Sequence, residues 1–307
     1  AVWFRTLNLS NTMELTAHYE KEVSTMWELK DQQSDSRLGT SVTSDSFTGK
    51  RKQYNQLEKR TMTEVTTRKG DTPDGNSTTY KYWIYRRKFE DVIIYDEDDQ
   101  INLGQIALPD SEEVTQMSAA SNRTKDSVII SAFDATRYIG ENGTDTEAFD
   151  TAYQVAVDYV ASGSTANSGL TLAKISKAKQ IMDEAEVPFG ERFFGHSAQQ
   201  LQDMLLLDKM TSEDYAAVKA LIDGKIEKFL GFTFIQTELC SLNNGTDVRT
   251  CFAWHKSGIK FAEIGRNVHI DVRADMRHAK QIRYVYRAGA VRTATNRVVR
   301  VYTDESP

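Results

Sequence analysis

The residues best suited to chemistry are four consecutive carboxylates, Asp96, Glu97, Asp98 and Asp99. Carboxylate oxygens are the ligands that divalent cations such as Ca²⁺ prefer. Consecutive side chains on a strand point to opposite faces, however, and no Asp-x-Asp-x-Asp-Gly calcium loop follows the run. We therefore favour a solvated acidic edge, or a partner for a basic segment, over a cation site.

Other patterns that mark enzymes and cofactor sites are absent from the sequence. The five histidines show neither His-x-x-x-His nor Cys/His spacing, which zinc sites use. The glycine patterns GxxxxGKS/T and GxGxxG, which bind phosphate groups, do not occur either. We therefore predict no enzymatic activity, no metal and no cofactor.

Two cysteines, Cys240 and Cys251, flank an Asn244-Gly245 pair, which is a strong hairpin signal. Thiols on the two arms of a hairpin can face each other, so a disulfide is one interpretation. Its geometry is demanding, and the sequence begins without the pattern of a secretory signal. Free thiols, as in reducing compartments, are the favoured prediction.

Composition indicates a globular protein with an uneven charge distribution. The 307 residues carry a formal net charge of −6, whereas proteins that coat nucleic acid are normally basic. No apolar run approaches the roughly 20 residues of a membrane-spanning helix, so no membrane partner is expected. Basic residues nevertheless concentrate between residues 50 and 88, and the remainder is acid-rich.

The basic segment has the pattern of a long β-hairpin. Residues 61–68 and 78–85 are rich in β-branched and aromatic side chains, and residues 69–76 between them are dense in turn formers. A two-stranded ribbon is marginal alone in water, so it needs a surface to lie on. The residues predicted to make contacts between subunits are Lys50, Arg51, Lys52, Tyr82, Ile84, Arg86, Arg87 and Lys88, with Asp96, Glu97, Asp98 and Asp99 as the acidic set.

Three interpretations of the hairpin are open. Complementary charge favours a neighbouring subunit as the surface on which it lies. An exposed hairpin with a solvated basic face in a monomer is the second. The third is a grip on single-stranded nucleic acid, with aromatic residues such as Trp83 stacking on bases.

Hydrophobic periodicity predicts helices followed by strands. The expected helices cover residues 111–139, with a polar patch at 122–126, and residues 147–160, 172–185, 197–205 and 211–224. Thr171 is the expected cap of the helix over 172–185, and Ser197-Ala-Gln-Gln200 fits a capping box. Residues 13–29 are a helix candidate, with a frayed terminus as the equal alternative. Strands are expected over residues 229–236, 251–254, 269–275, 282–286 and 299–301.

An ordered set of these segments resembles the major capsid proteins of tailed bacteriophages with the HK97-type fold. The match runs from about Tyr80 to the C-terminus. The segments that carry it are Arg86-Arg-Lys-Phe-Glu-Asp91, residues 169–187, 211–224 and 229–235, Ala253-Trp-His-Lys-Ser-Gly258, Gly289-Ala-Val-Arg292 and Val298-Val299.

The resemblance implies an α+β fold of four parts. These are an N-terminal arm (residues 1–45), an extended β-hairpin loop (46–90), a peripheral domain with a long spine helix and a sheet (91–165 and 261–307), and an axial domain (166–260). Some capsids of this fold crosslink a loop lysine to a neighbouring asparagine. Nothing in this sequence singles out a reacting set, so no crosslink is expected.

The function implied by the resemblance is self-assembly. Copies of the chain would form pentamers and hexamers of an icosahedral phage head around double-stranded DNA, assembled in the host bacterial cytoplasm and present in the virion. The expected partners are the chain itself, portal, scaffold and cement proteins, and packaged DNA through weak non-specific contact. The alternative is a cytosolic homo-oligomeric nucleic-acid-binding protein that uses residues 50–88.

Overall fold

The computed structural model describes residues 32–64, 66, 68, 70, 75, 77–95, 112–160, 166–205 and 228–306. The predicted helices over residues 13–29 and 211–224, and the acidic run Asp96–Asp99, lie outside the described residues.

Three sheets organise the described chain. The first has the order β1-β13-β14-β4, the second β7-β15-β12-β8-β10-β9 with β11 paired to β12, and the third β2-β3-β5-β6. The strands are β1 Thr43–Ser46, β2 Arg51–Leu57, β3 Thr79–Tyr85, β4 Arg87–Tyr95, β5 Arg137–Ile139, β6 Asp145–Glu147, β7 Gln154–Val155, β8 Arg192–His196, β9 Lys228–Phe229, β10 Phe232–Gln236, β11 Leu242–Asn243, β12 Val248–His255, β13 Ile259–Arg273, β14 Ala279–Arg292 and β15 Val298–Asp304.

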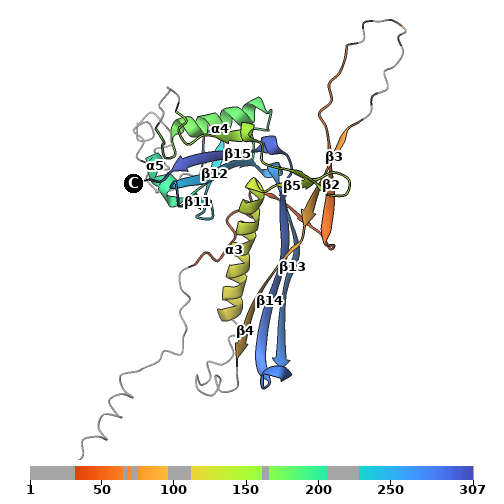
Figure 1. The fold of residues 1–307 in the computed structure, drawn as a ribbon, viewed down its shortest axis with the longest axis vertical. Coiled ribbons are helices and arrows are strands. Elements are labelled where there is room, and N and C mark those ends of the chain that lie inside the picture. Colours follow the sequence, from red (N-terminus) through yellow and green to blue (C-terminus); the bar gives the residue numbers. More distant parts are fainter. Residues whose placement is uncertain are drawn as a thin grey trace, which may run out of the picture.

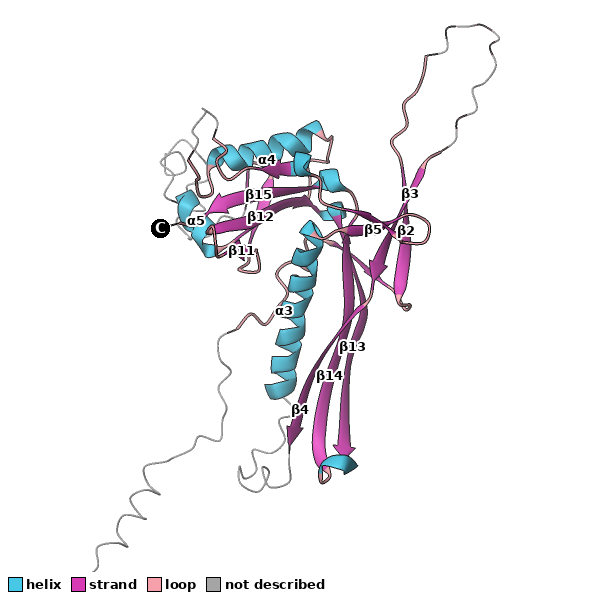
Figure 2. Ribbon diagram, in the orientation of Figure 1, coloured by secondary structure: helices cyan, strands magenta, loops and turns pink. Residues whose placement is uncertain are grey.

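Helices cover two of these sheets. The long helix α3 (Glu112–Asp134) runs beside β14 and β4, and α4 (Leu172–Glu184) lies over β15, near the shorter α5 (Ala198–Leu205) (Figure 1). The β2-β3 hairpin lies on the side of β13 and β14 that is away from α3, as Figure 2 shows. None of the helices in the described part of the chain is long and apolar enough to cross a membrane.

The local signals at the starts of α4 and α5 are confirmed. Thr171 caps α4, because its side chain accepts a hydrogen bond from the backbone of Lys174. At α5 the Gln200 side chain accepts a bond of 2.9 Å from the backbone N–H of Ser197, which is half of the predicted capping box.

Two helix predictions around residue 140 need correction. The helix predicted to reach residue 139 ends at Asp134, and Arg137–Ile139 form β5, which pairs with β3 and β6. The segment predicted as a helix over residues 147–160 contains a 3₁₀ turn and β7, which pairs with β15. Pairing with distant strands overrides local propensity here.

Strand β12 separates two apolar cores. Its side chains alternate, as they must on a strand, so that Phe252 and Trp254 enter the core beneath α3 while Cys251 and Ala253 enter the core beneath α4. The Trp254 indole N–H donates to the backbone oxygen of Ser41 at 3.0 Å. One strand therefore joins the two bodies into a continuous framework.

The Gly289-Ala-Val-Arg292 segment has a packing explanation. A Cβ at Gly289 would lie 2.5 Å from the backbone oxygen of Tyr85, so only glycine lets β3 cross β14 at this distance. Arg292 is fully buried and donates to Phe133 O at 2.8 Å and Ala135 O at 3.2 Å, at the end of α3. Burial lowers the pKa of Arg292 to about 10.

Candidate assembly surfaces

A hairpin is present, but its first strand is β2 (Arg51–Leu57), whereas the prediction placed that strand at residues 61–68, whose described members are not in a strand. The hairpin segment divides into two halves. Its inner half consists of β2 and β3, which pair from Arg51 with Tyr85 to Leu57 with Thr79. Its outer half, residues 58–78, follows beyond the last of these pairs. Strand β3 also pairs with β5, so the inner half belongs to a four-stranded sheet and is more than an isolated ribbon.

A charged cluster ties the inner half to β1. The Asp45 carboxylate accepts hydrogen bonds from Lys52 Nζ at 2.8 Å and from the Tyr54 hydroxyl at 2.6 Å. These two bonds lower the pKa of Asp45, and burial, followed by the bond to Asp45, raises the pKa of Tyr54. Lys260 on β13 lies over the Tyr54 ring at 4.1 Å, which fixes the hairpin to the long sheet.

Tyr82 and Ile84 face inward, which corrects the prediction that they reach a neighbour. Ile84 is fully buried and Tyr82 is 6% exposed, in a core with Phe47, Ala262 and Val291. Alternate side chains of a strand share a face, so Tyr82 and Ile84 lie on the same face of β3. That face packs on the subunit's own long sheet, so these two side chains are not available for another subunit.

Two of the predicted basic residues also have partners within the subunit. Arg51 donates to Asn142 O at 2.9 Å and lies over the Trp83 ring at 4.6 Å. Lys52 is paired with Asp45 in the charged cluster. Their charges are thus largely engaged at the inner half of the hairpin.

The remaining predicted basic residues are exposed. Lys50, Arg86, Arg87 and Lys88 all lie at the point where the hairpin meets β4. Lys88 pairs with Glu90 at 2.8 Å on the surface, a contact worth about 1 kcal/mol or less. Within the described residues, the side chains of Lys50 and Arg86 make no hydrogen bond or ion pair, so both can meet an external partner.

The described residues of the outer half are exposed as well. Met62 is completely exposed, and Leu57, the last residue of the inner half, is 70% exposed. Lys59 forms a surface ion pair with Glu186 of the α4 body. Exposed apolar and basic side chains on a projecting element are typical of a protein interaction site.

The family match decides what kind of protein displays this surface. Residues 15–305 match the family described as phage capsid protein, which is nearly the whole chain. The chain belongs to the phage capsid protein family. It is therefore a structural capsid component, and the family match favours this function over the nucleic-acid-binding alternative.

Solved phage heads share the fold of this capsid chain. A chain of the Helicobacter pylori bacteriophage KHP40 head has a TM-score of 0.70 and 11% identity, with 99% of this chain and 100% of that chain covered. A chain of the Cyanophage Pam1 capsid has a TM-score of 0.67 and 11% identity, with 94% of this chain and 97% of that chain covered. A chain of Mycobacterium phage Che8 has a TM-score of 0.64 and 14% identity, with 92% of this chain and 97% of that chain covered. The predicted HK97-type α+β fold is confirmed. No curated protein matches the chain.

A second exposed surface of this capsid chain lies on β13. The strand alternates as predicted, but its apolar residues Val268, Ile270 and Val272 are 43%, 61% and 61% exposed. Strand β1 pairs only with Lys260–Glu263, so no described strand pairs with the outer edge of β13 beyond that point. An apolar row beside an unpaired edge is suited to contact with another chain.

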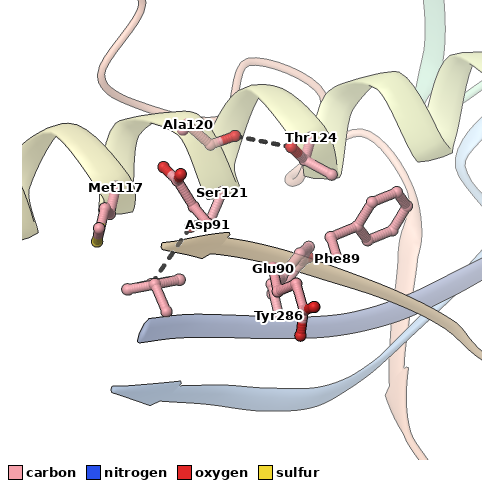
Figure 3. A pocket seen from close by; sticks show the side chains of 9 residues that line it. Phe89, Glu90, Asp91, Met117, Ala120, Ser121, Thr124 and Tyr286 are labelled. Atoms are coloured by element: carbon pink, nitrogen blue, oxygen red, sulfur yellow. Dashed lines mark hydrogen bonds between the residues drawn. The ribbon is translucent and has the colours of Figure 1, made fainter. Parts of the chain in front are cut away.

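The cleft between α3 and the long sheet has a packing role. It encloses about 60 Å³ between Phe89, Glu90 and Asp91 of β4, residues of α3, and tyrosines of β14 (Figure 3). That space admits a few water molecules but no organic substrate. Burial raises the pKa of Tyr286 in its wall, which keeps the phenol neutral.

The described residues include the two cysteines and part of the candidate metal ligands. Among the described residues, no group of three or more His, Cys, Asp or Glu side chains lies close enough to hold a metal ion. Cys240 and Cys251 are buried free thiols. A hydrogen bond with Cys251, together with burial, raises the pKa of Cys240, which makes its reactive thiolate scarce.

Sequence reasoning missed the residues that hold the hairpin in place. Asp45 is the last residue of the predicted N-terminal arm, and the prediction assigns its partner Lys52 to an interface between subunits. An acidic residue seven positions before a lysine is a weak signal by itself. In the structure Asp45 lies on β1, which pairs with β13, and Lys52 lies on β2, which pairs with β3, so their contact joins two sheets.

Proposed function

We propose that copies of this chain assemble as pentamers and hexamers into a closed icosahedral shell around double-stranded DNA, and that its role is structural rather than catalytic. The observation that carries the proposal is the hairpin, whose inner half is anchored in the subunit while its outer half exposes Met62 and several basic residues. Such a projection in a member of a capsid family is suited to reach across to the next subunit.

The parts of the subunit divide the work in this proposal. Residues 1–45 act as an arm, 46–90 as the extended loop, 91–165 with 261–307 as the peripheral domain, and 166–260 as the axial domain around the capsomer axes. Two separate cores, one under α3 and one under α4, support a division into two domains, although β7 and β15 of the proposed peripheral ranges pair into the sheet under α4. The exposed apolar row on β13 supplies a further surface on which a neighbour can lie.

Charge complementarity guides the docking. The exposed Arg86, Arg87 and Lys88 of one subunit meet acidic residues of the next, with Asp96–Asp99 as the proposed acidic partner. Each exposed pair contributes about 1 kcal/mol or less, so the shell gains its stability from repetition. Salt screens such pairs over a distance of about 8–10 Å near physiological ionic strength, so assembly should depend on salt.

Other partners follow from the same role. Portal, scaffold and cement proteins are the proposed companions during assembly in the host bacterial cytoplasm. The net charge of −6 keeps contact with packaged DNA weak and non-specific, because like charges repel.

The proposal is tested by charge reversal at the hairpin base. The variant Arg86→Glu/Arg87→Glu/Lys88→Glu should fold but form no shells, because these side chains are exposed and the reversed charges repel the acidic partner. The matched control, Arg86→Lys/Arg87→Lys, keeps the charge and should form shells. Circular dichroism monitors folding and negative-stain electron microscopy monitors shells. Normal particles from the charge-reversed variant would refute the docking scheme.

A further inference from the structure

The polar patch at residues 122–126 interrupts the apolar face of α3, yet the helix continues through it from Glu112 to Asp134. Polar groups in a packed helix need hydrogen-bond partners, because burying them unpaired costs free energy. The partners are residues 32–38, the described segment that leads to β1. The patch is therefore a binding surface for the chain's own N-terminal connector.

Asp126 is the centre of this contact. Its side chain is only 1% exposed, which is rare for a carboxylate without partners. One carboxylate oxygen accepts from Gln33 Nε2 at 2.6 Å and from the backbone N–H of Arg37 at 2.9 Å. The other accepts from Ser36 Oγ at 2.5 Å and from the backbone N–H of Leu38 at 3.3 Å. Hydrogen bonds to a charged acceptor are the stronger kind.

Two neighbours of Asp126 extend the contact toward residue 32. Asn122 Nδ2 donates to Ser34 O at 2.7 Å. Arg123 donates to the Gln32 side chain at 2.7 Å and to Gln33 O at 3.3 Å. The connector is thus held on successive turns of one rigid helix, with bonds that set its direction as well as its position.

The chain after this segment is held in a different way. Leu38 and Val42 are buried in the core beneath α3, and Trp254 binds Ser41 O. Residues 32–37 lack such core anchors and depend on polar contacts, which include an Arg37 bond to Gln236 O at 3.0 Å. Loss of the contacts at α3 would consequently release the segment before Leu38 without unfolding the chain from Leu38 onward.

Helix stability does not explain an aspartate at this position. Asp is a poor residue for a helix interior, because its side chain competes for backbone groups. An alanine or leucine at position 126 would suit an amphipathic helix better. The arrangement of four donors around Asp126 accounts for the residue where helix propensity does not.

We propose that Asp126, Asn122 and Arg123 form a connector latch, which fixes the position and direction in which residues 1–31 leave the body, and that shell assembly requires it. The inference rests on the proposed function, in which residues 1–31 reach a neighbouring subunit. Fixing the start of the arm raises its effective concentration at that neighbour and lowers the entropy lost on docking. Asp126 is thus a positioning residue.

The test uses the full chain with two independent latch variants. Asp126→Asn keeps the shape but places an amide N–H₂ against donors, and Asn122→Ala/Arg123→Ala removes the partly exposed contacts while leaving Asp126. Ser127→Ala changes the next, exposed residue of α3 and is the control. Hydrogen exchange is measured on the purified chain, and closed shells are counted by electron microscopy.

The latch predicts selective loosening. In Asp126→Asn the single uncharged amide oxygen can accept on only one side of the contact, so the amide of Arg37 or the amide of Leu38, which bond to different oxygens of Asp126, should exchange at least about tenfold faster. The amides of β1 should keep their protection. In the double variant, the exchange of residues 32–37 should accelerate. Shell yield should fall about tenfold in both variants relative to Ser127→Ala.

The outcomes separate the latch from the proposed function. Unchanged exchange at both Arg37 and Leu38 in Asp126→Asn would overturn the latch. Faster exchange with a normal yield of shells would overturn its role in assembly. If the unaltered chain and Ser127→Ala both form no shells, the proposed function fails, and with it the assembly role, while the exchange data still decide whether Asp126 holds the connector.

Discussion

The inner and outer halves of the hairpin are built on opposite principles. The inner half buries Tyr82 and Ile84 in the subunit's own core and engages Asp45 through hydrogen bonds. The outer half begins at residue 58 and leaves its described side chains exposed, including the whole of Met62. One segment of the chain thus joins the subunit's own core through β2 and β3 and exposes its described side chains between those two strands.

The contrast shows how a hairpin that would be barely stable alone can project from the subunit. A free two-stranded hairpin is barely stable in water, so one end must be fixed before the other can project. Burial of Ile84 and pairing with β5 supply that fixed end. The outer half can then find its stabilising surface on another subunit without affecting the fold of its own.

The largest effect should come from opening a cavity in the inner half. Ile84→Ala removes a fully buried side chain and should lower the free energy of unfolding by about 2–5 kcal/mol. Met62→Ala, at a completely exposed position of the outer half, should change it by less than about 0.5 kcal/mol. Denaturant unfolding measures both. Equal effects would abolish the distinction between the two halves.

The crossing of β3 over β14 should be nearly as sensitive. Gly289→Ala places a Cβ 2.5 Å from Tyr85 O, and the resulting overpacking should cost about 1–3 kcal/mol. Gly190→Ala is the matched control, because nothing lies within 4 Å of a Cβ there. Thermal unfolding of the two variants checks the comparison. A melting temperature of Gly289→Ala equal to that of the unaltered chain would mean that β3 does not cross β14 at Gly289.

Acid should weaken the attachment of the inner half through Asp45. Because Lys52 and Tyr54 lower the pKa of Asp45, its stabilisation is full above about pH 5 and is lost as the pH falls through about 4 toward the lowered value. Asp45→Asn should therefore cost about 1 kcal/mol at pH 7, and less at pH 3. Denaturation midpoints at the two pH values measure this. A gap between the unaltered chain and Asp45→Asn that does not narrow in acid argues against the cluster.

The smallest change in the stability of the subunit is expected from a substitution in the outer half. Met62→Ser alters a completely exposed side chain, so the free energy of unfolding should change by less than about 0.5 kcal/mol. Shell yield should nevertheless fall, since Met62 is proposed to contact a neighbour. Calorimetry and particle counts on the same preparation test both parts. An unaltered yield of shells from Met62→Ser would show that Met62 does not contribute to the contact with a neighbouring subunit.

Local signals predicted much of the fold from sequence. The sequence predicts the Asn244-Gly245 hairpin, the Thr171 cap and a strand over residues 269–275 that overlaps the end of β13, because each depends on residues close together in the chain. The predicted strand runs too far, since Ala274–Met276 form a 3₁₀ turn. The ordered segments near Trp254 and Gly289 then led to the capsid fold. The structure explains both residues. Trp254 fills the core beneath α3, and Gly289 allows β3 to cross β14 at a short distance.

Features set by distant partners were not predicted. Alternation showed that Ile84 and Ile270 lie on apolar faces, but not that the first face is covered and the second is exposed. The short strand β5 was taken as the end of α3, because three residues carry too little periodicity to distinguish. Asp126 was noted only as part of a polar patch, since its donors lie about 90 residues away.

The most direct test of assembly by the outer half of the hairpin is a cryo-electron microscopy reconstruction of particles formed by the full chain. We predict a closed icosahedral shell of five- and six-membered rings, in which residues 58–78 contact an adjacent subunit while Ile84 stays in its own core. A purified chain that remains dispersed, or a shell in which residues 58–78 touch no other subunit, would contradict the account.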